Sequence, residues 1–350
     1  MFPQLLPYLA DNEKASDYFE IQRWPNGVVC PYCQGQEIEQ RERSENGLQR
    51  YSCRLCAKAK GQQYRMFTVW SESIYEKSKL SPTLWLWVIA CWQIKLNSSE
   101  IALAVGINEQ SAARCVNLLD GSVYESHHLD PERQLSGQVE ADECYQTAGH
   151  KGQPRRVADE ERPGRRRVLK RRGRATAQQG RPPILGLVQR PDRTDKEEQA
   201  VAEIYLEVLP NVQTETIKPI ILAKVQTDSQ LLTDEYAIYN FTAQAGYDHR
   251  TVNHGQGEYA RLDPDGTVVH CNTIEGVWTG LRTFLRRFAG VSQKFLHLRV
   301  ARYEFLHNHR HLDLLQLFQS ALQHSFRATA GYWRQMVKKH RRIPLTLCYR

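Results

Sequence analysis

Two cysteine pairs near the N-terminus limit what this 350-residue chain can fold into more than any other feature. Cys30 and Cys33 form one CxxC pair, Cys53 and Cys56 form the other, and nineteen residues separate the pairs. Two such pairs on facing turns supply the tetrahedral thiolate shell of a structural zinc ion. The shell is closed, so the site stabilises a domain and does not catalyse. We predict a zinc ribbon over residues 21–69 that holds one Zn²⁺.

Disulfide bonds are the alternative use of these cysteines. Polar sequence follows the first residues and no secretory signal precedes the pairs, so we expect a reducing cytoplasm and therefore zinc. Residues 1–20 are expected to form a helical lead to the ribbon. Four aromatic side chains are expected to make its small core: Trp24, Tyr51, Tyr64 and Phe67. The remaining cysteines have no paired spacing and are expected to be buried or incidental thiols: Cys91, Cys115, Cys144, Cys271 and Cys348.

Residues 75–125 have the pattern of a helical segment. The apolar run at residues 84–92 is nine residues long. About twenty are needed to span a bilayer, so the run predicts a buried helix and no membrane segment. Capping residues at 97–99 precede a short helix that ends at Gly106, and a second helix starts after Asn108. This layout predicts a helix-turn-helix that binds DNA, with a plain all-α linker as the alternative. The second helix would present four side chains to a groove: Asn108, Gln110, Ser111 and Arg114.

Three carboxylates further along the chain lie in contexts that suit metal ligands. Asp142 lies in a short predicted strand, where period-two alternation puts Glu140 on the same face. Asp234 lies where another apolar strand ends, and ligands bind at strand ends in α/β sheets. Glu275 opens a helical pattern and shares a helix face with Arg282. The chain has 39 acidic residues, so each acid taken alone would be an ordinary surface residue.

Taken together, the three acids can hold two divalent ions. Hard cations such as Mg²⁺ prefer oxygen ligands. Two ions about 4 Å apart can stabilise both the attacking and the leaving oxygen when one phosphodiester oxygen displaces another. The sequence therefore predicts a two-metal site for phosphodiester chemistry, with two Mg²⁺ ions or Mn²⁺ in their place.

The residues around these acids form a series of short blocks. The blocks are residues 139–143, 233–236 with Tyr239 and Asn240, 252–254 with 257–259, 270–278, and 303–305 with Asn308 and Arg310. In this order, over most of residues 137–311, they resemble the ISXO-type insertion-sequence transposases of bacteria. The blocks are specific because they recur together and not as single motifs.

The resemblance implies an RNase H-like core in which Asp142, Asp234 and Glu275 bind two magnesium ions and drive DNA cleavage and joining. The family usually has a lysine seven positions after the glutamate, and this chain has Arg282 there. Arginine can hold a phosphate as a bidentate fork, so we expect it to keep the role. The resemblance also implies double-stranded DNA as partner, both terminal inverted repeats and target, at least a homodimer on that DNA, and a cytoplasmic, nucleoid-associated protein.

The charge of the chain favours the same partner. The net charge is +8, and residues 150–183 hold twelve Lys and Arg against three acidic residues. This stretch has interspersed Pro and Gly and no periodicity, which indicates a basic insertion at 149–183 that contacts phosphates, with a solvated loop as the alternative. Residues 326–350 form a second basic segment, a C-terminal tail. The DNA contacts expected in the insertion are Arg165, Arg166, Arg167, Lys170, Arg171 and Arg172.

The order of predicted elements favours an α/β core with a mixed sheet. The elements expected after the strand of Asp142 are strands at 184–188 and 208–212, a helix at 215–225, the strand that ends at Asp234, a helix to 245, a strand at 251–254, and helices that begin near 272 and 293. Strands first and then alternating strands and helices fit a mixed sheet. We predict one core domain over residues 135–325. His254, His270 and Glu258 are expected near its site, either as catalytic or as structural residues.

These features predict a transposase that binds the ends of its element and catalyses metal-dependent DNA cleavage and strand transfer. Two alternatives remain: a DNA-binding regulator with a non-catalytic core, and an RNase H-like nuclease that acts on hybrid or branched nucleic acid. Inverted repeats beside the gene would favour transposition over both.

Overall fold

The computed structural model describes residues 3–58, 65–148, 176–177, 180–191, 202–253, 257–258 and 260–328. The chain divides after His127 and again after His311 into two compact units. The first unit contains the cysteine pairs and most of the helices, and the second contains the three predicted site carboxylates. The basic insertion lies almost entirely outside the described residues, as do most of the C-terminal tail, Tyr64 and Cys348.

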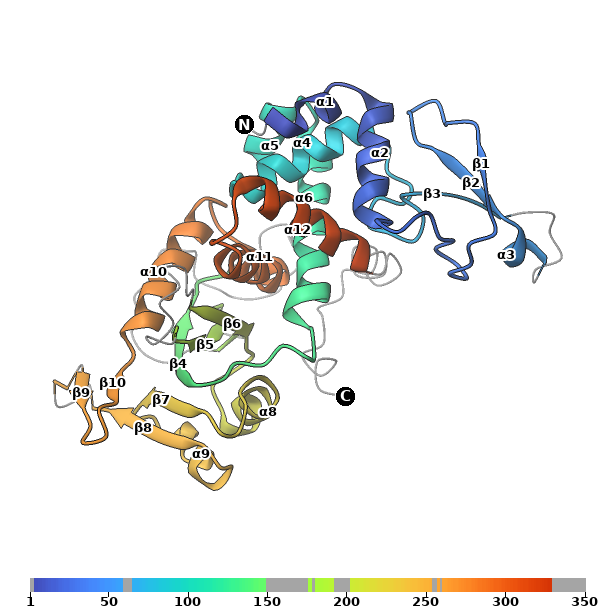
Figure 1. Cartoon of the computed structure of the whole chain (residues 1–350). Coiled ribbons are helices and arrows are strands. Elements are labelled where there is room, and N and C mark those ends of the chain that lie inside the picture. The colour runs from blue at the N-terminus through green and yellow to red at the C-terminus, as the bar shows by residue number, and fades with distance from the viewer. Residues whose placement is uncertain are drawn as a thin grey trace, which may run out of the picture. The chain divides into compact units, whose positions relative to one another are not determined.

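The segment that contains the second cysteine pair forms a three-stranded antiparallel sheet (Figure 1). Its strands, in spatial order, are β1 (Ile38–Arg41), β2 (Arg50–Cys53) and β3 (Arg65–Thr68), and α3 (Arg54–Lys58) follows β2. The ring of Trp24 meets the rings of Tyr51 and Phe67 edge-on at centroid distances of 6.1 and 6.0 Å. Tyr51 stacks on Phe67 at 5.5 Å. These three rings form the small core expected from the sequence.

Helices make up the rest of the first unit. They are α1 (Leu6–Leu9) after a 3-10 turn at Pro3–Leu5, α2 (Asn12–Arg23), α4 (Pro82–Gln93), α5 (Ser98–Val105), α6 (Glu109–Val123) and α12 (Leu314–Arg327). The apolar run expected to form a buried helix is α4, whose Trp92 donates a 2.6 Å hydrogen bond to the buried carboxylate of Asp120. No helix in the described part of the chain is long and apolar enough to cross a membrane.

Capping residues set both ends of α5 and the start of α6. Asn97 caps α5 and forms a capping box with Glu100. Gly106 ends that helix with φ of 74°, in the left-handed region that a side chain disfavours. Asn108 then caps α6 through a 2.8 Å bond from the backbone N–H of Ser111. The helices therefore begin and end where the capping residues predicted.

The predicted end of the core differs from the structure. We placed residues up to 325 in the core, but α12 belongs to the first unit. Its buried face, which includes Leu317, Phe318 and Leu322, packs against α2, α4 and α6. An apolar helix face can be recognised in a sequence, but the sequence does not say which partner buries it.

A five-stranded mixed sheet forms the centre of the second unit (Figure 1). Its strands, in spatial order, are β6 (Glu203–Val208), β5 (Pro183–Gln189), β4 (Gln138–Tyr145), β7 (Gln230–Asp234) and β8 (Asp248–Val252). The pairs β4–β5 and β5–β6 are antiparallel, and β4–β7 and β7–β8 are parallel. This topology confirms the predicted fold class, an α/β RNase H-like core preceded by a zinc ribbon and an all-α segment.

Helices cover both faces of this sheet. On one face, α10 (Asn272–Arg286) and α11 (Leu296–Asn308) pack on side chains such as Ile184 and Leu232. On the other, α8 (Thr214–Lys224) and the 3-10 turn η5 (Ala237–Tyr239) pack on Ala141 and Leu185. Strand residues alternate between the two layers, so Glu140 and Asp142 face α10 as the alternation predicted.

Two predicted elements were placed wrongly, and one hairpin was missed. The strand expected at 208–212 is β6, which ends at Val208. The helix expected to reach 245 is divided into η5 and the single turn α9 (Phe241–Gln244). A hairpin of β9 (Ala260–Leu262) and β10 (Val268–His270) was not predicted, because three-residue strands are too short to show alternation.

A cluster of charged side chains lies buried between β6 and α11. His128 Nδ1 lies 3.1 Å from Glu304 and its Nε2 lies 3.0 Å from Glu207. Arg133 forms ion pairs with Glu304 and with Glu203. Burial lowers the pKa of His128, but the charges of Glu304 and Glu207 outweigh burial and hold it at about 9. His128 therefore carries a positive charge between two carboxylates at neutral pH.

Candidate active site

Asp142 lies within β4 on the face covered by α10. Its Oδ2 accepts a 2.8 Å hydrogen bond from the indole N–H of Trp278 in α10. One carboxylate oxygen is thus fixed by a side chain of the helix. The carboxylate is largely enclosed, which places its charge in a medium of low polarity.

The strand opposite Asp142 makes room for the Trp278 indole. In the β4–β5 ladder the cross-strand partner of Asp142 is Gly186. A Cβ added at Gly186 would lie 2.5 Å from the Trp278 ring and 2.9 Å from Cδ1 of Ile274. Any side chain there would therefore displace the indole that holds Asp142. Gly186 is needed for close approach of helix and sheet.

Asp234 ends β7, the strand parallel to β4. The last register pair between β4 and β7 joins Glu140 to Leu232, and Asp142 and Asp234 each lie two residues further on. Parallel strands keep their register, so the two aspartates lie side by side on the same face. Asp234 Oδ1 accepts a 3.0 Å bond from the backbone N–H of Tyr236, which fixes the carboxylate where the strand ends.

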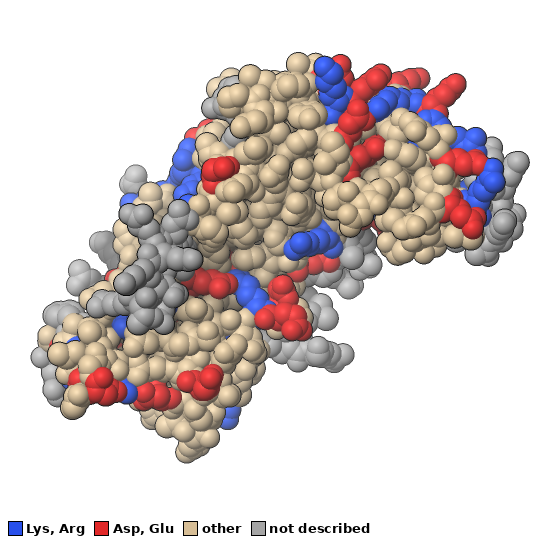
Figure 2. Space-filling model, viewed as in Figure 1, with Lys and Arg blue, Asp and Glu red and all other residues tan. Residues whose placement is uncertain are grey.

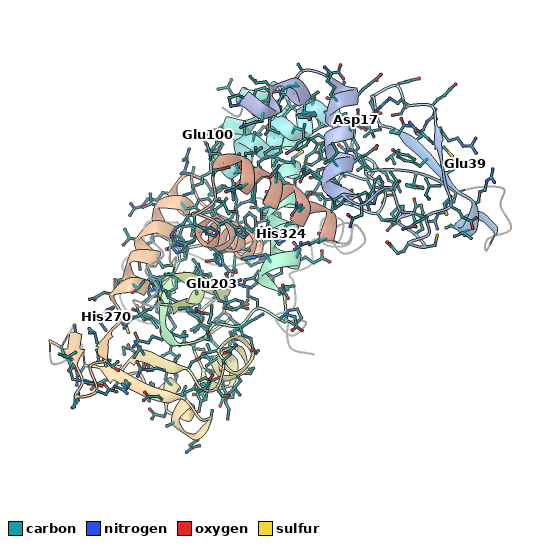
Figure 3. All side chains as sticks on the ribbon, viewed as in Figure 1. Asp17, Glu39, Glu100, Glu203, His270 and His324 are labelled. Carbon is teal, nitrogen blue, oxygen red and sulfur yellow. The ribbon has the colours of Figure 1, made fainter. Side chains whose placement is uncertain are left out.

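Glu275 lies in the first turn of α10 and is exposed. Its position depends on Glu140, whose buried carboxylate accepts a 2.9 Å bond from the backbone N–H of Ile274. The same carboxylate forms a 2.6 Å ion pair with Arg190 and lies 3.3 Å from His270 (Figure 3). Glu140 thus ties the N-terminus of α10 to the strand that carries Asp142, and Glu275 follows at the next residue.

The charges of the three acids act on the same groups. Burial raises the pKa of Asp142, and after the opposing hydrogen bonds the charges of Asp234 and Glu275 raise it further. Burial also raises the pKa of Cys271, as do the charges of Glu140, Asp142 and Asp234. The predicted carboxylates are therefore close enough to repel one another, a repulsion that a bound cation would relieve.

The three carboxylates are nevertheless more spread out than a single-ion site. Among the described residues, one group of three potential ligands has all its ligand atoms within 4.8 Å of one another, and it consists of cysteines. Magnesium binds its ligands at about 2.0–2.1 Å, so atoms around one ion lie at most about 4.2 Å apart. The carboxylate set as it stands is therefore too wide for one ion.

Arg282 lies two turns after Glu275 on α10 and is exposed. Burial raises the pKa of the Cys144 thiol to about 12, and the positive charge of Arg282 acts in the opposite direction. Arg282 therefore lies near Cys144, which is two residues beyond Asp142 on the same strand face. The predicted phosphate-holding residue thus lies beside the carboxylates.

The cysteine pairs of the ribbon come together. The thiols of Cys30, Cys33 and Cys53 lie within 4.8 Å of one another, and Cys33 Sγ lies 3.6 Å from Cys53 Sγ. All described cysteines are free thiols, so the disulfide alternative does not hold for them. The fourth thiol, Cys56, is buried outside this trio, and Arg65 Nη1 lies 3.7 Å from its sulfur.

The predicted DNA-contacting side chains of α6 differ in their surroundings. Gln110 and Arg114 are exposed. The side-chain oxygen of Asn108 caps the helix, and the backbone N–H of Ser111 is its donor. The six basic residues expected in the insertion, Arg165, Arg166, Arg167, Lys170, Arg171 and Arg172, lie outside the described residues.

Two of the three residues left open by the sequence have protein partners. His270 lies 2.8 Å from Arg190 through Nδ1, close to Glu140 and the start of α10. Glu258 accepts bonds from the backbone of Asn253 and from Arg261. His254 lies outside the described residues.

Sequence reasoning missed a second pair beside the carboxylates. The hydroxyl of the buried Tyr239 donates a hydrogen bond to Glu143, the residue after Asp142. Burial raises the pKa of Tyr239, and the charges of Glu143, Asp142 and Asp234 add to the effect. Tyr239 thus contacts the residue that follows Asp142 on β4. It was among the block residues, but its spacing gave no indication of this contact.

Comparison with known proteins places the chain among transposases that have a DDE domain. A family model described as the ISXO2-like transposase domain matches residues 134–308, and one described as a transposase zinc-ribbon domain matches residues 10–59. The chain belongs to the ISXO2-like transposase family. The predicted resemblance and the zinc-ribbon domain are therefore confirmed.

Two curated proteins are similar to this chain. An uncharacterized protein in transposable element ISH50 of Halobacterium salinarum is 29% identical over 288 residues, which cover 80% of this chain and 85% of the relative. An uncharacterized transposase-like protein of Haemophilus influenzae is 28% identical over 106 residues, which cover 30% of this chain and 81% of the relative. Both names agree with the family assignment.

Proposed function

We propose that this transposase cuts and joins DNA at a site formed by Asp142, Asp234 and Glu275, which bind two Mg²⁺ ions, with Mn²⁺ as a substitute. The observation that carries the proposal is the convergence of these acids from β4, β7 and α10. Asp234 lies about ninety residues after Asp142 in the sequence, and Glu275 lies about forty residues after Asp234. The charges of Asp234 and Glu275 nevertheless raise the pKa of Asp142.

The donor set fits two divalent ions. All the ligands are carboxylates, the class that Mg²⁺ and Mn²⁺ prefer. The set is too wide for one ion, and Asp142, Asp234 and Glu275 would instead share two ions between them. When bound, such ions lower the barrier by stabilising the attacking and leaving oxygens.

The residues of the chain supply positioning and phosphate binding. Trp278 holds one oxygen of Asp142, and Glu140 holds the α10 N-terminus so that Glu275 stays beside the aspartates. Arg282 can donate two parallel hydrogen bonds to a non-bridging oxygen pair of the DNA phosphate. These contacts keep the reacting phosphate near the acids without a covalent bond to the protein.

We further propose that Cys30, Cys33, Cys53 and Cys56 bind one structural Zn²⁺. Three thiols are already gathered, and a rotation of the Cys56 side chain away from Arg65 would complete the set. Four thiolates give the closed tetrahedral shell of a structural site. The zinc would fix the first cysteine turn relative to β2.

For recognition of the element ends, we propose that α5 and α6 act as a helix-turn-helix. Gln110 and Arg114 are exposed on α6 and can reach base edges, while Asn108 and Ser111 fix the start of that helix next to the DNA. The basic insertion, residues 149–183, would add phosphate contacts that any sequence can use. Two ends must be brought together for joining, so we propose a dimer or larger assembly on DNA.

The test is a strand-joining assay on labelled duplex DNA that carries the element's own ends. Wild type should cleave and join with Mg²⁺ and not with a chelator, and Asp234→Asn should bind the ends but not cleave. Asp228→Asn is the matched control, because Asp228 is exposed in the turn that precedes the same strand and should leave joining unchanged.

Two outcomes would replace this proposal. End binding without cleavage by wild type would leave a DNA-binding regulator. Cleavage of hybrid or branched nucleic acid without preference for the element's ends would leave an RNase H-like nuclease.

A further inference from the structure

A pocket of about 890 Å³ in the first unit lies beside the first cysteine turn, and none of the three site carboxylates lines it. Its walls come from the end of α2, the first cysteine turn, the start of β3 and the end of α12. The residues that carry the argument are Arg23, Tyr32, Arg65, Phe326 and Arg327, with Glu72 as the one carboxylate in the lining. This volume lies within the range of about 300–1,000 Å³ typical of small-molecule sites.

Within the described residues, the pocket carries positive charge that no ion pair neutralises. Among these residues, three arginines line it against one carboxylate. None of the three forms an ion pair with a carboxylate within the described residues. Arg23 donates to backbone carbonyls and Arg65 to the Cys56 sulfur. Buried or enclosed cations normally have an acidic partner.

Arginines elsewhere on the ribbon behave differently. Figure 2 shows basic and acidic side chains intermixed over this part of the first unit. Glu39 forms ion pairs with both Arg41 and Arg54, and Arg43 pairs with Asp17 at 2.7 Å. Arg41, Arg43 and Arg54 are thus paired with acidic side chains. Arg50 and the pocket arginines form no such pair among the described residues, and Arg50 donates to a backbone carbonyl instead.

Arg23 is the most enclosed of the three. Its Nη1 donates to the carbonyl oxygens of Val69 and, at 2.8 Å, Ser71. Burial lowers the pKa of its guanidinium to about 10, while the charge of Glu72 acts in the opposite direction. The group remains charged at neutral pH, and its hydrogen-bond acceptors in the described residues are two backbone carbonyls.

Aromatic rings accompany these charges. The Arg23 guanidinium lies 5.1 Å from the Trp24 ring centroid and 5.3 Å from that of Phe326. The guanidinium of Arg65 lies 3.2 Å from the ring centroid of Tyr32. Aromatic rings and guanidinium planes are the surfaces on which unpaired bases stack, and arginine forks bind phosphates.

We propose that this pocket binds one unpaired nucleotide of the DNA on which the transposase acts. Arg23, Arg65 and Arg327 hold its phosphate, and the base lies against the Phe326 and Tyr32 side of the pocket. A base within a duplex cannot offer its face to these rings, so a single-stranded end or an opened base pair is the form that fits. The proposal rests on the family's action on DNA, but not on the carboxylate site.

The test measures binding of fluorescein-labelled hexathymidylate and of a blunt 20-base-pair duplex by fluorescence anisotropy, at fixed salt and without divalent ions. The full-length protein carries Asp234→Asn throughout, so no cleavage interferes. The pocket variants are Arg327→Gln and Phe326→Leu. The control is Arg50→Gln, which removes an exposed ribbon arginine outside the pocket lining. Zinc content and thermal unfolding verify that each variant is folded.

Each pocket variant should weaken hexathymidylate binding about tenfold, since stacking of one base contributes about 1–3 kcal/mol. Arg50→Gln should change it less than twofold, and duplex binding should change less than hexathymidylate binding in every variant. Equal losses in Arg50→Gln and the pocket variants would overturn the proposal in favour of general charge attraction. Equal losses for duplex and single strand would overturn it in favour of backbone contacts. Neither result bears on strand joining by the carboxylates.

Discussion

Replacement of Gly186 by alanine tests whether the contact between helix and sheet holds the candidate site together. The new Cβ would lie 2.5 and 2.7 Å from two carbon atoms of the Trp278 ring and 2.9 Å from Ile274. Carbon atoms in contact lie about 3.5–4.0 Å apart, so the indole must shift by about 1 Å. That shift would lengthen the 2.8 Å hydrogen bond from Trp278 to Asp142 beyond bonding distance.

The expected loss of stability follows from the same contacts. Extra carbon in a well-packed core typically costs about 1–3 kcal/mol. Trp278 is buried and its ring is packed by the sheet and by α10, so it cannot rotate into solvent. For a unit of this size, about 1 kcal/mol lowers Tm by about 2–4 °C. We therefore expect Gly186→Ala to lower Tm by about 3–10 °C.

The matched control is Gly276→Ala in α10. A Cβ at Gly276 meets nothing within 4 Å, so alanine there should stabilise the helix by about 0.5–1 kcal/mol. Thermal unfolding followed by circular dichroism gives both values, and strand joining gives the effect on activity. A Gly186→Ala variant with unchanged Tm and full joining would refute the claim that the Trp278 contact positions Asp142.

Three further predictions concern other parts of the chain. The folded-state pKa of His128 is about 9, above an unfolded value near 6.5, so its ion pairs with Glu304 and Glu207 stabilise the fold fully below pH 6.5 and are lost as pH rises through 9. The free energy of unfolding should fall by up to about 3 kcal/mol over that window, and His128→Gln should remove this pH dependence in denaturant titrations. Removal of zinc by a chelator, or the substitution Cys33→Ser, should unfold the ribbon, because its core of three rings is too small to stay folded without the metal. Zinc content measures the loss of the metal, and near-ultraviolet circular dichroism measures the unfolding. An unchanged spectrum after zinc loss would contradict the prediction. Arg282→Ala should reduce the rate of strand joining about tenfold or more, and Arg282→Lys should restore part of that rate. A lysine keeps the charge that attracts the phosphate but lacks the two parallel donors of arginine. Equal rates for the Ala and Lys variants would argue against a phosphate-binding role.

The features that the sequence predicted well are those set by neighbouring residues. The spacing of Cys30, Cys33 and Cys53 is local, and the structure gathers their thiols. The end of a strand at Asp234 and the start of a helix near Glu275 can both be predicted from patterns of ten residues or fewer. Because parallel register then aligns β4 with β7, the placement of the acids followed from correct elements alone.

The features that were missed depend on partners distant in the sequence. Nothing near Gly186 reveals that it lies opposite Asp142, because β5 reaches β4 only after the long basic insertion. The bond from Ile274 to Glu140 joins residues 134 positions apart. For α12, the apolar face was visible in the sequence, but the unit that buries it depends on tertiary packing.

The most direct test of the central claim is metal-specificity rescue at Asp234. Strand joining by wild type and Asp234→Cys is measured with Mg²⁺ and then with Mn²⁺, on the same end-bearing duplex. Thiolate suits Mn²⁺ better than it suits Mg²⁺, so a ligand role predicts that Asp234→Cys joins no DNA with Mg²⁺ and recovers with Mn²⁺. Wild-type rates with Mg²⁺ in this variant would show that the reaction does not use Asp234 as a metal ligand.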